Sequence, residues 1–236
     1  MLLVFCCCIF ILLILLWSIV FKYLPLCLIT VFLVTLSLFN LFGPIKKVEA
    51  SSPALKTSSL CTHHILSTEE ELALPSGMLL AISIVEAGVN GKPHPYAVHK
   101  RGRSYYAKSP AHAKSLITNK NGSYLRNTSV GCMQLQTTYH HKKFASFDEM
   151  ISPEANVKYG GNYLKKHFKT YGNWSRAVRR YNGGKARQTR RYLCKVYNVL
   201  RQIELNSARL LDHSACGSSK PYVSHAILDA YQSFHS

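Results

Sequence analysis

The chain of 236 residues begins with a long apolar block that cannot belong to the core of a soluble domain. Residues 2–20 and 26–42 form two apolar runs, separated by a short interruption around Lys22. A run of about 20 apolar residues is long enough to cross a bilayer as a helix. Val48-Glu49-Ala50 resembles the small-x-small pattern at which signal peptides are cleaved. We therefore predict that residues 1–50 are a hydrophobic signal or transmembrane anchor segment, and the sequence leaves open whether it is cleaved.

The rest of the chain has the length of one ordinary domain. About 190 residues follow the apolar block, which is enough for a single domain with a real core. Residues 51–60 are rich in serine, proline, lysine and threonine, which is typical of a linker. We assign residues 61–212 to the predicted catalytic domain and treat residues 213–236 as a C-terminal tail of unknown role.

The apolar pattern of this domain predicts that it is almost wholly helical. The clearest helix spans residues 153–171, with Pro153 near its start, apolar or aromatic side chains along it and Gly172 after its end. Strand signals are scarce, so the predicted fold class is all-α, with at most one small β-hairpin between Ala97 and Tyr106. The other predicted helices span residues 62–73, 78–86, 110–118, 132–144, 174–181 and 189–211, with a loop at 123–131 and a turn at 147–150.

The charge distribution indicates an anionic partner. The formal net charge is +18, from 29 Lys and Arg against 11 Asp and Glu. Residues 155–203 contain 13 of these cations and no acid. Such a balance suits nucleic acid, acidic lipid or an acidic cell-wall polymer. The basic helix predicted at 189–211 is the one candidate for nucleic-acid recognition and matches no recognition motif, so nucleic acid is not the expected partner.

Four cysteines lie beyond the apolar block, namely Cys61, Cys132, Cys194 and Cys216. They lack the CxxC and HxxxH spacings of zinc sites, so we predict neither a metal site nor another cofactor. In an exported domain they are candidates for disulfide bonds. We expect Cys61 to pair with Cys194 or Cys216, and Cys132 to be a buried free thiol.

Glu86 is the most conspicuous acid of the domain. It ends an apolar stretch, residues 78–85, in which only Ser83 is polar. Burial at such a position raises the pKa of a carboxyl group, and a general acid for glycosidic cleavage must hold its proton at neutral pH. A glutamate that points to water from the end of a helix is the alternative interpretation, and this feature alone does not exclude it.

Two further motifs favour the catalytic interpretation. Gly131-Cys132-Met133-Gln134 places a glycine before a predicted helix and a glutamine in its first turn. Tyr181-Asn182-Gly183-Gly184 ends another predicted helix with an aromatic hydroxyl, an amide and two glycines. Together with Glu86, in this order and over residues 60–205, these motifs resemble the lytic transglycosylases related to the soluble lytic transglycosylase and to goose-type lysozyme.

The chain departs from the pattern of that family at several positions. Ala87 stands where the family usually has serine, Cys132 where it has leucine, and Arg180 where alanine is common. The missing serine hydroxyl affects a hydrogen bond near the glutamate or the substrate, but it leaves the proton donor in place.

The resemblance implies a mainly helical, lysozyme-like fold and the activity of a peptidoglycan lytic transglycosylase. Such an enzyme cleaves the β-1,4 bond between N-acetylmuramic acid and N-acetylglucosamine and closes a 1,6-anhydro ring without consuming water. Glu86 would be the single general acid and base, and Met133 would line the cleft. Gln134 would bond to sugar or backbone, and Tyr181 would hold the Glu86 carboxyl or stack against it. Asn182 would bind an N-acetyl group or fix its loop.

The scarcity of acids supports a mechanism with one carboxylate over hydrolysis by a pair. After Glu86 the next acids are Asp148 and Glu149, followed by Glu154. The sequence leaves open whether any of these three approaches the cleft. Hydrolysis of the lysozyme type is accordingly the less favoured reaction.

The implied partners are peptidoglycan glycan strands and, through residues 1–50, a membrane. These partners place the domain in the bacterial cell envelope, on its periplasmic or extracytoplasmic face, either anchored or exported. The alternative function is a non-enzymatic peptidoglycan-binding scaffold of a secretion or conjugation apparatus. Such a scaffold would keep the fold but lose Glu86, Gln134 or Tyr181, and all three are present.

Overall fold

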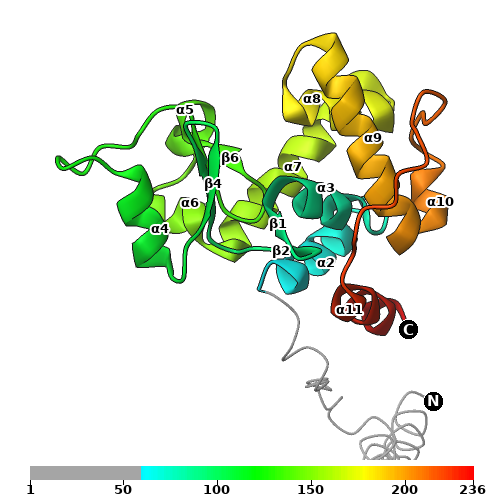
Figure 1. Ribbon diagram of the computed structural model, residues 1–236, viewed down its shortest axis with the longest axis horizontal. Helices are drawn as coiled ribbons and strands as arrows, with labels where there is room; N and C mark the ends of the chain where they lie inside the picture. The colour runs from blue at the N-terminus through cyan, green and yellow to red at the C-terminus, as the bar shows by residue number, and fades with distance from the viewer. Residues whose placement is uncertain (1–59) are drawn as a thin grey trace, which may run out of the picture. The chain divides into compact units, whose positions relative to one another are not determined.

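The computed structural model describes residues 60–236, which are mostly helical with a small β-sheet (Figure 1). The helices are α2 (Leu60–Glu71), α3 (Met78–Ala87), α4 (Pro110–Ile117), α5 (Thr137–His140), α6 (Phe147–Ile151), α7 (Pro153–Tyr171), α8 (Trp174–Asn182), α9 (Ala186–Ile203), α10 (Leu205–Ala208), α11 (His225–His235) and the 3-10 helix η2 (His141–Lys143). The strands are β1 (Gly88–Val89), β2 (Lys92–Pro93), β3 (Ala97–Lys100), β4 (Arg103–Tyr106), β5 (Thr128–Val130) and β6 (Leu135–Gln136). The predicted signal or anchor segment lies outside the described residues. Within residues 60–236, no helix combines the length and the apolar character that a membrane span needs.

Helix α3 forms the centre of the hydrophobic core. Residues 78–82 are 0 % exposed, and the helix packs against α2 and α9. Its N-terminus is capped by Glu69 of α2, whose carboxylate accepts three backbone N–H groups at 2.6–3.0 Å. Burial raises the pKa of Glu69 to about 7, although these three donors favour its charged form. The start of the helix is therefore fixed, and so is the position of Glu86 near its end.

Helix α7 is the longest of the described helices, and its prediction is confirmed at both ends. Pro153 occupies its first turn, and Gly172 closes it with a left-handed φ of 60°. The helix packs against α2 and α8. Phe168 stacks on Trp174 of α8 with the ring centroids 3.9 Å apart. This packing holds the end of α8 beside the cleft described below.

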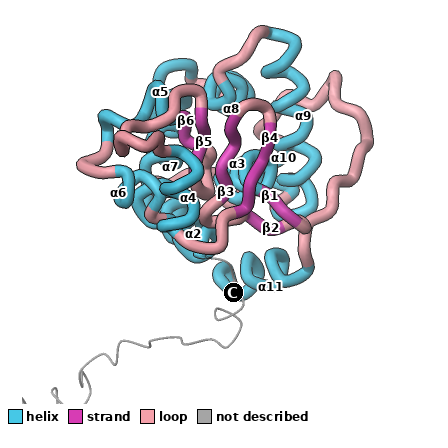
Figure 2. Tube along the Cα trace, turned by 60° about the vertical axis from the view of Figure 1, so that its left-hand side comes forward, coloured by secondary structure: helices cyan, strands magenta, loops and turns pink. Residues whose placement is uncertain are grey.

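The four-stranded sheet is antiparallel, in the order β4-β3-β5-β6 (Figure 2). Val98 of β3 pairs with Tyr105 of β4 and with Val130 of β5, and Val130 pairs with Leu135 of β6. The predicted hairpin is confirmed as β3 and β4, but the all-α prediction missed the two strands that extend it. β5 has three residues and β6 has two, which is too short for alternation to be recognised in a sequence. β1 and β2 form a separate antiparallel pair.

The prediction of a helix over residues 132–144 was wrong for the first part of that range, which is not helical. The chain turns sharply at Gly131 and Gln134, whose φ angles are 79° and 48°, and an α-helix cannot include such angles. The chain then passes through β6 and becomes helical only in α5 and η2.

Two other boundaries also differ from the prediction. The turn expected at residues 147–150 is the short helix α6, whose N-cap Ser146 accepts the Glu149 N–H at 3.1 Å. The helix expected at 189–211 begins earlier, at Ala186, and ends at Ile203, after which α10 forms a separate turn.

Two disulfide bonds, Cys61–Cys132 and Cys194–Cys216, overturn the predicted cysteine pairing. Cys132 is not a free thiol, because its partner Cys61 lies at the start of α2 beside the turn that follows β5. The two positions are 71 residues apart, so only tertiary packing brings them together. The second bond ties α9 to the segment that follows α10.

The C-terminal segment, residues 217–236, packs against the rest of the described chain. The Arg201 guanidinium of α9 donates to two carbonyls of this segment at 3.0–3.1 Å. The Ser224 N–H donates to the Gly91 carbonyl, in the turn between β1 and β2, at 3.2 Å. Helix α11 lies against α2 and buries Ile227 in the core. The hydrophobic core thus extends beyond the predicted domain boundary at residue 212.

Candidate active site

The five residues predicted for the site come together around one cleft. Glu86 is the penultimate residue of α3, is partly exposed, and opens onto a cleft with a volume of about 420 Å³. The walls of the cleft come from the end of α3, the turn between β5 and β6, α5, α7 and the end of α8. The other predicted site residues in these walls are Met133, Gln134, Tyr181 and Asn182.

Burial raises the pKa of the Glu86 carboxyl to about 7. Two residues of α9 act in the opposite direction: Tyr192 as a hydrogen-bond donor and Lys195 through its positive charge. The Tyr192 hydroxyl is buried beside Glu86 and makes no hydrogen bond of ordinary geometry within residues 60–236, so it is free to donate to the Glu86 carboxylate. Near neutral pH, Glu86 is therefore divided between its protonated and charged forms, as a residue that both gives and takes a proton requires.

Tyr192 is a member of the site that the sequence did not reveal. It belongs to the basic helix α9, where an aromatic residue at a core position is ordinary. The signal that could have found it is its place on the inward face of that helix, together with Leu193 and Val196.

The turn that carries Met133 and Gln134 is held in place by Asn156 of α7. The Asn156 side chain is 0 % exposed, and its amide oxygen accepts the Met133 N–H at 2.8 Å. Its amide nitrogen donates to the carbonyls of Val130 and Met150 at 3.1 and 2.9 Å. Gly131 is required here, since a Cβ in its place would lie 2.4 Å from the Asn156 side chain. One buried amide thus shapes one wall of the cleft.

Gln134 lies in this turn, with a left-handed φ of 48°, and not in a helix as predicted. Its side-chain nitrogen donates to the carbonyls of Ala97 and Gly131 at 3.0 and 3.1 Å. The Gln134 amide therefore joins strand β3 to the turn. The prediction was a hydrogen bond to sugar or to backbone, and these two bonds are to backbone. Its carbonyl oxygen has no partner within residues 60–236 and can accept a hydrogen bond from a ligand in the cleft.

Tyr181 ends α8 and contacts the same turn. Its hydroxyl donates to the Met133 carbonyl at 2.9 Å. Burial raises the pKa of Tyr181, and the charge of Glu86 raises it further. The two side chains are therefore neighbours, although the Tyr181 hydroxyl bonds to Met133 and not to Glu86. The side-chain oxygen of Asn182 is buried and has no hydrogen-bond partner in the described part of the chain. The substrate contacts assigned to these residues stay predictions.

Helix α3 contacts the turn through Ser83 and not through Ala87. The Ser83 hydroxyl, one helical turn before Ala87, donates to the Cys132 carbonyl at 2.8 Å. Ala87 itself is 2 % exposed and does not line the cleft. The cleft wall at this point is thus positioned from Ser83 and from the disulfide at Cys132.

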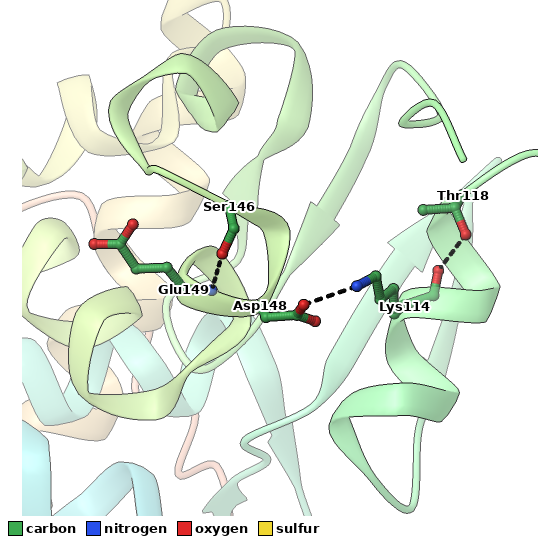
Figure 3. A network of polar contacts seen from close by, with 5 residues as sticks. All are labelled: Lys114, Thr118, Ser146, Asp148 and Glu149. Atoms are coloured by element: carbon green, nitrogen blue, oxygen red, sulfur yellow. Dashed lines mark hydrogen bonds and ion pairs between the residues drawn. The ribbon is translucent and has the colours of Figure 1, made fainter. Parts of the chain in front are cut away.

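The other acids considered for catalysis lie elsewhere. Figure 3 shows Asp148 directed at Lys114 of α4, with which it forms an ion pair at 2.7 Å. Glu149 accepts the Ala145 N–H, and Glu154 is exposed and acts on the pKa of His64. Among the described residues that line the cleft, Glu86 is the only acid. Within residues 60–236, no group of three or more His, Cys, Asp or Glu side chains is arranged to hold a metal ion.

Comparison with known proteins agrees with this geometry. A family model described as the transglycosylase SLT domain matches residues 64–199, more than half of the chain. No curated protein and no solved structure gives a significant match. The matched residues include Glu86, the turn with Gln134, and Tyr181. The chain therefore belongs to the transglycosylase SLT domain family.

Proposed function

We propose that this protein is a peptidoglycan lytic transglycosylase that cleaves the β-1,4 bond between N-acetylmuramic acid and N-acetylglucosamine. The observation that carries the proposal is Glu86, a single acid in a cleft, with a pKa raised to about 7 by burial. A glycosidase that uses two carboxylates needs a second acid at a defined distance. The walls of this cleft supply none from the described residues.

In the proposed mechanism, Glu86 acts twice. Its protonated form donates to the glycosidic oxygen while the bond from that oxygen to C1 of N-acetylmuramic acid breaks. The N-acetyl group of the substrate stabilises the positive charge that develops on this sugar. The Glu86 carboxylate then takes the proton of the 6-hydroxyl, whose oxygen bonds to C1 and closes the 1,6-anhydro ring. Glu86 regains its proton, and no water is consumed.

Digestion of purified peptidoglycan with the full chain, followed by mass analysis of the products, tests this reaction. We expect fragments with anhydro ends, and a loss of activity of at least about 10³-fold in Glu86→Gln, because glutamine cannot transfer the proton. Glu154→Gln is the matched control and should keep full activity, since Glu154 is exposed outside the cleft. Reducing ends in the products would mean hydrolysis, and an active Glu86→Gln variant would remove Glu86 from the mechanism.

The proposed location is the periplasmic or extracytoplasmic face of the bacterial cell envelope. Two disulfide bonds support this location, because such bonds persist in oxidising compartments. Attachment to the membrane through residues 1–50, and partnership with a secretion or conjugation apparatus, are further proposals that the sequence motivates. Accessibility of the domain to protease added to intact spheroplasts tests the location, and complete protection would contradict it.

A further inference from the structure

A second pocket, rich in arginine, adjoins the cleft. It has a volume of about 570 Å³, and both Tyr163 and Gly183 line it as well as the cleft that contains Glu86. Helix α8 contributes Arg176, Arg179 and Arg180 to its wall, and α7 contributes Tyr163, His167 and Tyr171. The pocket and the cleft are therefore neighbours that share two lining residues.

The charges of the three arginines are not neutralised by acids in the pocket. The described part of the chain has two ion pairs, Lys114–Asp148 and Lys158–Glu71, and neither involves these arginines. No acid lines the pocket. Asp212 also interacts with Arg179: hydrogen bonds from Ser214 chiefly lower its pKa, and the charge of Arg179 makes the smallest contribution. The Asp212 side chain is exposed and does not line the pocket.

Two of the arginines, Arg179 and Arg180, are held in place by contacts that leave their charge available. The Arg179 side chain donates from Nε to the Thr189 hydroxyl at 3.4 Å. The Arg180 guanidinium lies over the ring of Tyr171, 5.4 Å from its centroid. Both contacts position the guanidinium groups and leave donors free for a ligand.

His167 in the pocket wall carries a buried polar atom whose hydrogen-bonding capacity is unused. The ring nitrogen Nε2 of His167 is buried and has no hydrogen-bond partner within residues 60–236. Burial, followed by the charges of Lys166 and Arg180, lowers the pKa of His167. A buried polar atom without a partner costs free energy, and His167 is one of the residues that line the pocket.

Several arginines beside aromatic rings form a typical binding site for a planar anion. Guanidinium groups bind carboxylate and phosphate through paired hydrogen bonds, and the rings of Tyr163 and Tyr171 offer an apolar surface to the chain that carries the anion.

We propose that the pocket binds a carboxylate of the peptide stem carried by the N-acetylmuramic acid unit in the cleft. The proposal rests on peptidoglycan as the substrate, and it adds that the protein prefers strands with peptides to bare glycan. A phosphate group of an anionic wall polymer shares part of this chemistry, and the experiment below separates the two sources.

The test measures binding to the full-length Glu86→Gln variant, so that it does not depend on cleavage. The probes are a disaccharide of N-acetylglucosamine and N-acetylmuramic acid with a tetrapeptide stem, the same disaccharide without the stem, and inorganic phosphate as a competitor. We expect the stem to tighten binding about tenfold, and phosphate at 10-fold molar excess over the peptide probe not to displace it. In the double variant Arg176→Gln, Arg180→Gln, the disaccharide with the stem should bind no more tightly than the disaccharide without it.

The matched control is Arg101→Gln with Arg103→Gln, which removes the same charge from an exposed hairpin. It should keep the advantage of the stem, and thermal melting checks that both double variants are folded. Equal binding of the two disaccharides would overturn the proposal, and displacement by phosphate would reassign the pocket to a phosphate-bearing polymer. A chain that fails to cleave peptidoglycan but still prefers the stem would refute the enzymatic function and leave this inference intact.

Discussion

Glu86 must keep its proton until it meets the glycosidic oxygen, and its neighbours decide how easily it does so. Burial raises its pKa to about 7, and the neighbouring Tyr192 hydroxyl lowers it because it is a donor that favours the charged form. A general acid with a raised pKa is active below that pKa and loses activity as the pH rises through it. The activity of the unmodified protein should therefore fall above about pH 7.

Replacing Tyr192 by phenylalanine should move this loss of activity to higher pH. The variant lacks the donor that favours the carboxylate, so the pKa of Glu86 rises and a larger fraction stays protonated at pH 8. The measurement is kcat/KM for a soluble peptidoglycan fragment across pH 5–9. Tyr197→Phe, on the same helix but stacked on His213, is the control and should leave the profile unchanged. A shift to lower pH would show that Tyr192 does not donate to Glu86.

Tyr139 is a second residue of the cleft whose contribution to substrate binding can be measured separately from its contribution to catalysis. It lines the cleft and is 71 % exposed, so its ring is available to pack against a ligand there. Tyr139→Ala should raise KM about fivefold and change kcat by less than about twofold, because the ring would bind substrate and transition state alike. Tyr222→Ala, 65 % exposed outside this cleft, is the control. A fall in kcat with an unchanged KM would refute a binding role.

At the scale of elements, the turn between β5 and β6 depends on a residue of α7. Asn156→Ala should lower the free energy of unfolding by roughly 3 kcal/mol, because it leaves the Met133 N–H and two buried carbonyls without partners. Chemical denaturation measures this loss. Asn162→Ala, exposed on the same helix, should change stability by less than about 0.5 kcal/mol. Equal effects of the two substitutions would contradict the role of Asn156 in shaping the turn.

An element could be predicted from the sequence when the residues that determine it lie close to it along the chain. The ends of α7 are set by Pro153 and Gly172, and the hairpin of β3 and β4 by neighbours in sequence, so both were predicted. The turn at Gly131–Gln134 is set by Asn156, more than twenty residues later, and a helix was predicted in its place. Glu86 was proposed because its apolar helix occurs together with the motifs at residues 131–134 and 181–184, and the apolar helix alone did not decide it. Tyr192 was missed because its proximity to Glu86 exists only after α9 packs against α3.

For the whole molecule, the C-terminal segment contributes to the stability of the domain. The Cys194–Cys216 bond closes a loop with a sequence separation of 22 residues. Replacing both cysteines by serine should lower the free energy of unfolding by roughly 3 kcal/mol, mainly because the unfolded chain gains conformational freedom. Thermal or chemical denaturation measures the change, with the exposed Ser233→Ala as control. A stability equal to that of the unmodified protein would show that packing of α11 alone holds the segment.

The Cys61–Cys132 bond joins the first described helix to the turn that carries Met133 and Gln134. It can form only after residue 132 has been synthesised and both thiols have met an oxidant. A reducing cytoplasm does not provide that oxidant. If the protein acts on peptidoglycan, the last covalent step in building its cleft takes place in the compartment that holds the polymer. The chain would then acquire its final shape where its substrate is, and the cell that makes it would carry an unfinished enzyme until export.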